Sequence, residues 1–134
     1  MTAVLLDTHT LMWWLFDSPR LSNTALQIID EADAVYVSAA SLYEIDSKRR
    51  FPRARSRDVA LMRMPRDMPT ALPVLGLRLL DISVEVAWRA ANLAMDHGDP
   101  WDRILIAQAQ ALNVPLVSCD KALVAQAGDT PILW

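Results

Sequence analysis

The sequence predicts an α/β fold: a mostly parallel sheet of four to five strands packed between helices, as a three-layer α/β/α sandwich. Short apolar runs alternate along the chain with segments of helical periodicity, which is typical of parallel α/β proteins. The apolar runs are continuous, as expected for strands covered on both faces. The 134 residues, 53% of them hydrophobic, fit one domain over residues 1–134 with ample material for a core.

The first part of the chain predicts two strands and three helices. Pro19 and Pro52 each limit the helix before them, because the residue preceding a proline is disfavoured in helical conformation. We expect Ser22 and Ser41 to cap the second and third helices, which places Glu44 in the first turn of the third. The predicted elements are a strand at 3–6, a helix at 9–16, a helix from Ser22 to about 32, a strand at 35–38 and a helix from Ser41 towards 50.

Residues 52–73 are the least regular stretch, because they hold four of the eight prolines, and we expect only a short helix at 57–64 there. Further on, Asp99 followed by Pro100 is a well-formed helix start, with Asp at the cap and Pro at the first helical position. The remaining predicted elements are a strand at 79–82, a helix at 84–95, a helix from Asp99 to about 111, a strand at 114–118, a short helix after Asp120 and a strand at 132–134.

Four acidic residues fall where open α/β sheets bind ligands, beyond the carboxyl ends of the strands. Asp7 directly follows the first predicted strand and Asp120 the fourth, while Glu44 and Asp102 lie in the helices after the second strand and before the fourth. Such a cluster repels itself unless a cation is present. Its oxygen donors suit Mg²⁺ or Mn²⁺, and the lack of a His/Cys ligand set argues against zinc. A divalent ion held in this way can activate water and stabilise charge on a phosphoryl group.

Each of these acids also has a simpler structural explanation. Asp7 and Asp120 could cap the helices that follow them, and Glu44 could complete a capping box with Ser41. Asp102 could be only a favourable negative charge at a helix N-terminus. The residues taken singly leave both explanations open, and only their shared position favours a site.

The net charge of −3 conceals an uneven distribution. Eight of the 13 basic residues lie between positions 48 and 66: Lys48, Arg49, Arg50, Arg53, Arg55, Arg57, Arg63 and Arg66. A basic segment beside an acidic site is suited to hold the phosphates of a nucleic acid, and a solvated charged face is the alternative. The RNA-binding candidates are Lys48, Arg49, Arg50 and Arg53.

The only cysteine, Cys119, excludes an internal disulfide and suggests a reducing compartment. The sequence does not open with a secretory signal pattern, and it contains no apolar run long enough to cross a bilayer. We therefore expect a cytoplasmic protein without a membrane partner.

Four segments occur in an order that resembles the signature blocks of PIN-domain proteins, specifically the VapC-like toxins of bacterial type II toxin–antitoxin pairs. They are Leu5–His9, Val37–Ile45, His97–Ala109 and Pro115–Asp120, and they span nearly the whole chain. The resemblance implies an α/β/α sandwich with endoribonuclease activity that depends on Mg²⁺ or Mn²⁺. It also implies a homodimer and a cognate antitoxin that inserts a segment near the active site.

The family's acidic positions fall on Asp7, Glu44, Asp102 and Asp120. We expect Asp7, Asp102 and Asp120 to hold the metal directly or through water, and Glu44 to be a ligand or to position the water. The expected supporting residues are Thr8, which can orient Asp7 by a hydrogen bond, Ser118 near the last acid, and Asp99; His97 is a candidate phosphate contact. The chain departs from the pattern at Asp46 and in the basic, proline-rich stretch 52–73, which leaves substrate choice and antitoxin fit open.

Three other functions compete with this prediction. The first is a PIN-like module that has lost cleavage and binds only RNA or its antitoxin, against which the presence of all four acids counts. A receiver-like signalling domain needs a lysine after its last strand, and Lys121 is poorly placed because it directly follows Asp120. A phosphohydrolase of the haloacid dehalogenase type needs a second Asp two residues after Asp7, where the chain has His9.

Overall fold

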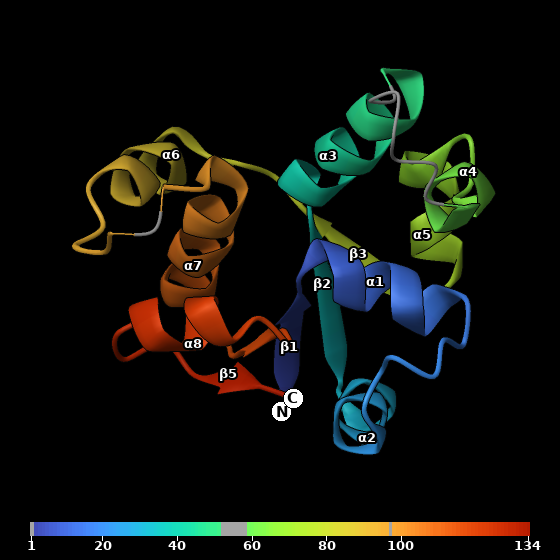
Figure 1. Ribbon diagram of the computed structural model, residues 1–134, viewed down its shortest axis with the longest axis horizontal. Helices are drawn as coiled ribbons and strands as arrows, with labels where there is room; N and C mark the ends of the chain where they lie inside the picture. Colours follow the sequence, from blue (N-terminus) through green and yellow to red (C-terminus); the bar gives the residue numbers. More distant parts are fainter. Residues whose placement is uncertain (1, 52–58, 97) are drawn as a thin grey trace.

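The computed structural model describes residues 2–51, 59–96 and 98–134. These residues form a five-stranded, entirely parallel sheet in the order β3-β2-β1-β4-β5 (Figure 1). The predicted fold class is therefore confirmed. The strands are β1 (Ala3–Leu6), β2 (Ala34–Ser38), β3 (Leu77–Leu80), β4 (Leu116–Val117) and β5 (Ile132–Leu133).

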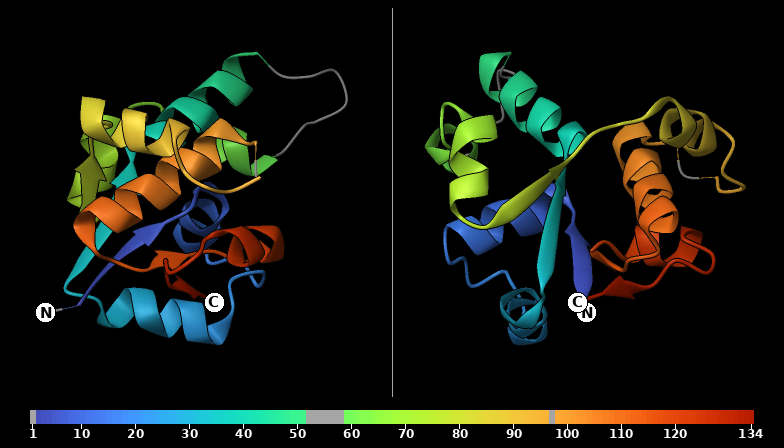
Figure 2. Two further views of the ribbon diagram at one scale, coloured as in Figure 1. Left: turned by 90° about the vertical axis from the view of Figure 1, so that its left-hand side faces the viewer. Right: turned by 180° about the vertical axis from the view of Figure 1, so that it is seen from behind.

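Helices cover both faces of the sheet (Figure 1). They are α1 (Thr8–Leu15), α2 (Asn23–Glu31), α3 (Ala39–Arg50), α4 (Val59–Arg63), α5 (Met68–Val74), α6 (Val84–Ala91), α7 (Pro100–Leu112) and α8 (Lys121–Gln126). The first five contribute to one buried cluster, whereas α7 and α8 contribute to another on the opposite face. The α6 helix packs against α7, as both views in Figure 2 show. None of the helices in the described part of the chain is long and apolar enough to span a membrane.

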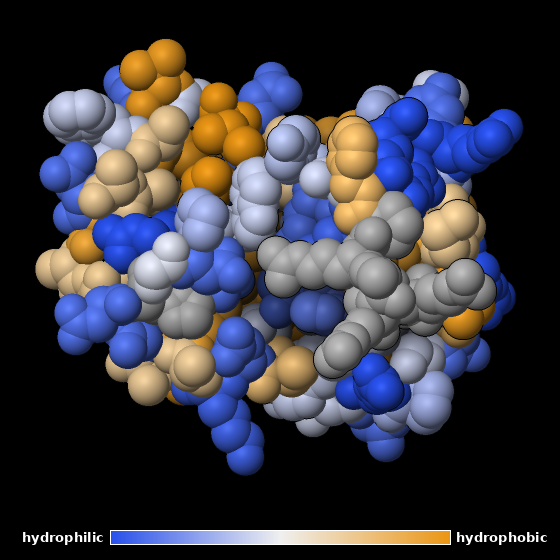
Figure 3. Space-filling model, turned by 45° about the horizontal axis from the view of Figure 1, so that its top comes forward, coloured by the Kyte–Doolittle hydropathy of each residue, from blue (hydrophilic) through white to orange (hydrophobic). Residues whose placement is uncertain are grey.

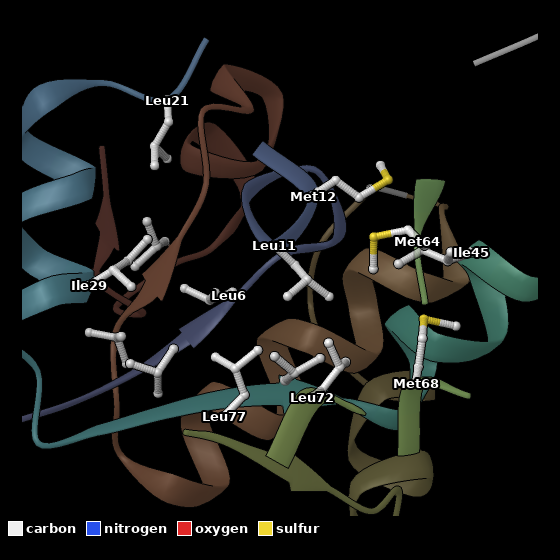
Figure 4. Packing of buried hydrophobic residues seen from close by; sticks show 14 of the residues in the cluster. Leu6, Leu11, Met12, Leu21, Ile29, Ile45, Met64, Met68, Leu72 and Leu77 are labelled. Carbon is white, nitrogen blue, oxygen red and sulfur yellow. The ribbon is translucent and has the colours of Figure 1, made fainter. Parts of the chain in front are cut away.

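The central strand β1 separates the two cores because its side chains alternate between the faces. Leu6 belongs to the larger cluster with α1 to α5, and Leu5 to the cluster with α7 and α8. Both leucines are fully buried, which stabilises the fold by roughly 2 kcal/mol for each side chain. In the larger cluster, Met64 and Met68 lie beside Ile45 of α3 (Figure 4). Burial on both faces explains why the strands are continuous apolar runs.

Side-chain caps begin most helices. The predicted cap Ser22 is confirmed, since its Oγ accepts a hydrogen bond from the Ala25 amide at 3.0 Å. The predicted cap of the third helix, Ser41, is wrong. The chain turns directly from β2 into α3, and Ser38 Oγ accepts from the Ala40 amide at 3.0 Å. Ser41 therefore lies inside the helix and Glu44 in its second turn, which excludes the capping box between them.

Several further elements differ from the predictions, among them β4, which spans Leu116–Val117 rather than 114–118. The third strand occupies 77–80 rather than 79–82, because Ile82 packs with the α6–α7 cluster instead of continuing the strand. The helix α5 was not predicted, because of its prolines. Pro69 sits in the first turn, where a missing amide costs no helical hydrogen bond. The helix α6 ends at Ala91 rather than at 95.

Arg103 of α7 explains the early end of α6. Its guanidinium donates to the carbonyl oxygens of Ala90 (2.9 Å), Leu93 (2.8 Å) and Met95 (2.9 Å), and more weakly to that of Ala91 (3.3 Å). These bonds satisfy the carbonyls at the end of α6 and bend the following residues around α7. Arg103 of α7 thus fixes the connection between α6 and α7.

We predict that Arg103→Lys lowers the free energy of unfolding by roughly 2 kcal/mol, because a single ammonium group cannot donate to all of these carbonyl oxygens. Chemical denaturation measures the loss, and hydrogen exchange should accelerate at residues 91–96. Arg78→Lys, at an exposed position on β3, is the matched control and should change stability by less than about 0.5 kcal/mol. Equal stability of the two variants would contradict a clamping role for Arg103.

Candidate active site

The central strands bring three chain segments to one edge of the sheet. Leu6 of β1 pairs with Val37 of β2 on one side and with Val117 of β4 on the other. Beyond these pairs, the Asp7 amide donates to the Val117 carbonyl oxygen at 3.2 Å. Figure 3 shows this end of the molecule, where hydrophilic side chains gather around a recess near the middle of the face. The edge where acids were expected is therefore also a polar hollow.

Asp7 and Asp120 both cap helices at this edge. Asp7 Oδ1 accepts a hydrogen bond from the Thr10 amide at 2.8 Å. Asp120 Oδ1 accepts from the amides of Ala122 (2.9 Å) and Leu123 (3.3 Å). Among the described residues neither Oδ2 accepts a hydrogen bond, so each carboxylate keeps one oxygen for another ligand. The structural explanation of these acids is thus confirmed, and it is compatible with a site.

Cys119 lies near both of these acids. Desolvation of the thiol raises its pKa, and the negative charges of Asp7 and Asp120 raise it further. The two carboxylates therefore make the surroundings of Cys119 electronegative. A field of this sign attracts cations.

Glu44 and Asp102 approach the same edge from α3 and α7. Glu44 Oε2 accepts from Lys48 Nζ at 3.0 Å, and Glu44 lines a small pocket of about 180 Å³ together with Thr8. Asp102 lies in the first turn of α7. The residues just before these two acids, Tyr43 and Trp101, join α3 to α7 through rings whose centroids are 5.2 Å apart.

The described residues contain no group of three or more His, Cys, Asp or Glu side chains arranged to hold one metal ion. Mg²⁺ needs fewer protein ligands than such a group supplies, because it usually keeps several waters and binds through one or two carboxylates. The open oxygens of Asp7 and Asp120 fit that requirement, and the all-oxygen donor set does not fit zinc. The chemistry of the site therefore suits a hydrated divalent ion.

Buried hydroxyl groups hold the edge together. Thr8 Oγ1 donates to Ser41 Oγ at 3.0 Å, which ties the start of α1 to α3 and differs from the predicted hydrogen bond to Asp7. Ser118 Oγ accepts from the Asp120 amide at 3.1 Å. Thr10 Oγ1 donates to the Val117 carbonyl at 3.0 Å. Thr10 was not among the residues expected at the site, and its one signal in the sequence is a polar residue directly before the apolar run Leu11–Leu15.

Asp99 is the predicted cap of α7, and this role is confirmed. Its Oδ1 accepts from the amides of Trp101 (2.9 Å) and Asp102 (3.2 Å), so it fixes the backbone of the neighbouring acid. His97 lies outside the described residues.

The basic candidates have different environments. Arg49 is largely buried, and its guanidinium donates to Asp46 (2.8 Å) and to the carbonyl oxygens of Met64 (2.9 Å), Pro65 (3.0 Å) and Arg66 (3.1 Å). In this structure Arg49 therefore holds the α4–α5 connection to α3.

The other basic candidates are more exposed. Lys48 pairs with Glu44, and the exposed Arg50 pairs with Asp46 at 2.7 Å. Hydrogen bonds from Arg50 and Arg49 lower the pKa of Asp46. The remaining candidates of the basic segment, Arg53, Arg55 and Arg57, lie outside the described residues.

The sheet order, the helix-capped strand ends and the acids at one edge are features of a PIN domain. The PIN-domain family model matches residues 4–128, and the chain belongs to this family. Over its whole length it is 31% identical, across 144 aligned residues, to Ribonuclease VapC22 of Mycobacterium tuberculosis, and the match covers 100% of both proteins.

Two solved structures share the fold. A toxin–antitoxin complex from Klebsiella pneumoniae superimposes with a TM-score of 0.65 at 19% identity, covering 98% of this chain and 96% of that one. FitAcB from Neisseria gonorrhoeae gives a TM-score of 0.66 at 18% identity, with coverage of 98% and 96%. At these identities the likeness concerns the fold alone.

The Thr8–Ser41 hydrogen bond predicts a measurable coupling between α1 and α3. We expect Thr8→Val and Ser41→Ala to be non-additive, with a coupling energy of about 1 kcal/mol, because each removes the same buried bond. Urea unfolding of the two single variants and the double variant measures it. Strictly additive losses would show that the two hydroxyls act independently.

Proposed function

We propose that this chain is a VapC-like, metal-dependent endoribonuclease that hydrolyses RNA phosphodiester bonds and acts as the toxin of a toxin–antitoxin pair. The observation that carries the proposal is the pair of helix-capping carboxylates, Asp7 and Asp120, at adjacent strand ends with one oxygen each left open. Ribonuclease VapC22, to which the chain is similar over its full length, supports RNA as the substrate.

Each acid has a distinct role in this proposal. Asp7, Asp102 and Asp120 hold Mg²⁺ or Mn²⁺, directly or through water. When bound, the ion supplies an activated water and stabilises the charge that develops on the phosphoryl group. Glu44 orients the attacking water, and Lys48 Nζ, 3.0 Å from its carboxylate, holds that carboxylate in position. This division agrees with the position of Glu44 in the second turn of α3, whereas Asp7 and Asp120 directly cap the helices that follow their strands.

The supporting residues act through the backbone. Asp99 accepts from the amide of Asp102, and Ser118 accepts from the amide of Asp120. In this proposal Asp99 and Ser118 therefore hold the two metal-binding acids in place without touching the substrate. Thr8 fixes the start of α1 against α3. Lys48 and Arg50 are exposed on α3 and contact RNA phosphates in this proposal, together with Arg53; the engaged guanidinium of Arg49 has a structural role instead.

The proposal includes protein partners and a compartment. The solved structure from Klebsiella pneumoniae is a toxin–antitoxin complex, and the shared fold supports a cognate antitoxin for this chain. We propose that the chain forms a homodimer and works in the cytoplasm, where RNA substrates are present and a lone exposed cysteine stays reduced.

The test is RNA cleavage with Mg²⁺ or Mn²⁺, with EDTA, and by Asp7→Asn. Asn also caps helices, so this variant keeps the fold while it removes the charge that holds the ion. We expect EDTA to abolish cleavage and Asp7→Asn to reduce it roughly 100-fold or more. Glu85→Gln, an exposed acid on α6, is the matched control and should cleave like the parent.

Cleavage that survives EDTA, or that is undiminished in Asp7→Asn, would exclude the metal mechanism. Calorimetry with Mg²⁺ and Mn²⁺ separates a nuclease from a module that has lost its activity. A folded parent protein that neither cleaves RNA nor takes up a divalent ion would be such a binding module.

A further inference from the structure

A groove leads away from the acidic edge along α1. A pocket of about 180 Å³ lies between α1, α3 and α4 and includes Glu44. A second pocket, of about 410 Å³, lies between α1 and α4 and continues to Arg20. His9 and Met12 line both pockets, so the two pockets adjoin along α1. Figure 1 shows the elements concerned, with α1 running from the strand ends toward the side that carries α4.

One side of this groove is aromatic. His9, Trp13 and Phe16 are spaced i, i+4 and i+7, which puts them on one face of α1 over about 10 Å of helix. The His9 and Trp13 ring centroids are 5.7 Å apart. Trp13 also packs edge-on against Trp134 at 5.7 Å, which holds the indole in place. Rings fixed along a groove are a stacking platform for unpaired bases.

The far end of the groove carries two arginines and one acid. Arg20, Arg63 and Asp17 line the 410 Å³ pocket. Both arginines are exposed, and no salt bridge between either and a described carboxylate is present, so the pocket keeps a net positive charge. The Arg63 guanidinium lies 4.8 Å from the centroid of the Phe16 ring, so a cation and an aromatic face stand together. At the near end Lys48 is paired with Glu44. Among the basic residues that line this groove, the two without a paired carboxylate therefore lie at its far end from Glu44.

We propose that this groove, here called the α1 groove, holds the single-stranded stretch of RNA next to the cleaved bond, with bases against His9 and Trp13 and phosphates at Arg20 and Arg63. The acidic edge repels phosphates, so a substrate that reaches it needs cations farther along its path. Arginines supply these cations, and the aromatic rings along the groove can stack on the bases of an unpaired strand. A duplex cannot bind in this way, because its base faces are stacked on one another. This inference rests on the proposed function and adds Arg20, which lies outside the basic segment.

The test is binding of a fluorescein-labelled single-stranded RNA of about 10 nucleotides in EDTA, so that no cleavage interferes. The variant Arg20→Ala/Arg63→Ala should raise the Kd about 10-fold and lower the slope of log Kd against log salt by about 0.7 for each phosphate that an arginine no longer neutralises. Arg78→Ala/Arg89→Ala removes the same charge from exposed positions on β3 and α6, and should leave the Kd unchanged.

The stacking component has its own pair of variants. His9→Ala, at an exposed position, should raise the Kd about 5-fold. Trp88→Ala removes an aromatic side chain that is 74% exposed on α6 and should have no effect. The same RNA in a duplex should bind more weakly than the single strand, because its bases are not available to the rings.

Several results would overturn the proposal. They are no measurable binding by the parent, equal losses in the two double-arginine variants, and unchanged binding by Arg20→Ala/Arg63→Ala. If that variant instead changes the sedimenting mass of the protein, the groove is a protein interface and the RNA assignment fails. The nuclease proposal fails separately: groove-dependent binding without metal-dependent cleavage refutes the nuclease alone, whereas cleavage with unaltered binding refutes the groove alone.

Discussion

The direction of the central strands is the constraint on which the site depends. Because β2, β1 and β4 are adjacent and parallel, the chain leaves all three at one edge. A helix follows each of them, and its first amides require acceptors. Asp7 and Asp120 supply these acceptors with one oxygen each. The amides and the positive end of each helix stabilise carboxylates that would otherwise repel one another. Folding and chemistry therefore use different oxygens of the same side chains.

The remaining elements hold this edge from outside. Arg103 folds the α6–α7 connection around the helix that carries Asp102, and Arg49 fastens the α4–α5 connection to the helix that carries Glu44. In both cases one guanidinium satisfies several backbone carbonyls that no regular element could pair. The two arginines lie in α7 and α3, whose ends meet through Tyr43 and Trp101. Arg49 and Arg103 thus have structural roles, which limits how much of the protein's positive charge faces outward.

Features set by local chemistry could be predicted from the sequence, and features set by distant residues could not. The apolar run at 3–6, the cap Ser22 and the Asp99–Pro100 helix start follow from neighbouring residues and were predicted correctly. The segment Ser38–Ser41 offers two serine caps, and only the register of β2 against β1 decides that Ser38 takes the role. The end of α6 depends on Arg103 from the next helix, and the burial of Arg49 depends on a connection 15 residues away. Asp7 and Asp120 were expected after the first and fourth strands, where the structure has them, but the hydroxyl partners of Thr8 and Thr10 lie in distant segments and could not be predicted.

The pairing of β1 with β4 has a consequence for how the protein is made. Leu6 must find Val117, more than 100 residues later in the chain, before Asp7 and Asp120 can share an edge. During synthesis at about 5–20 residues per second, the ribosome releases β1, β2 and the helix bearing Glu44 several seconds before β4. Until then the nascent chain carries some of its acids without their partners. The edge that carries Asp7 and Asp120 is consequently among the last parts of the protein to assemble during synthesis.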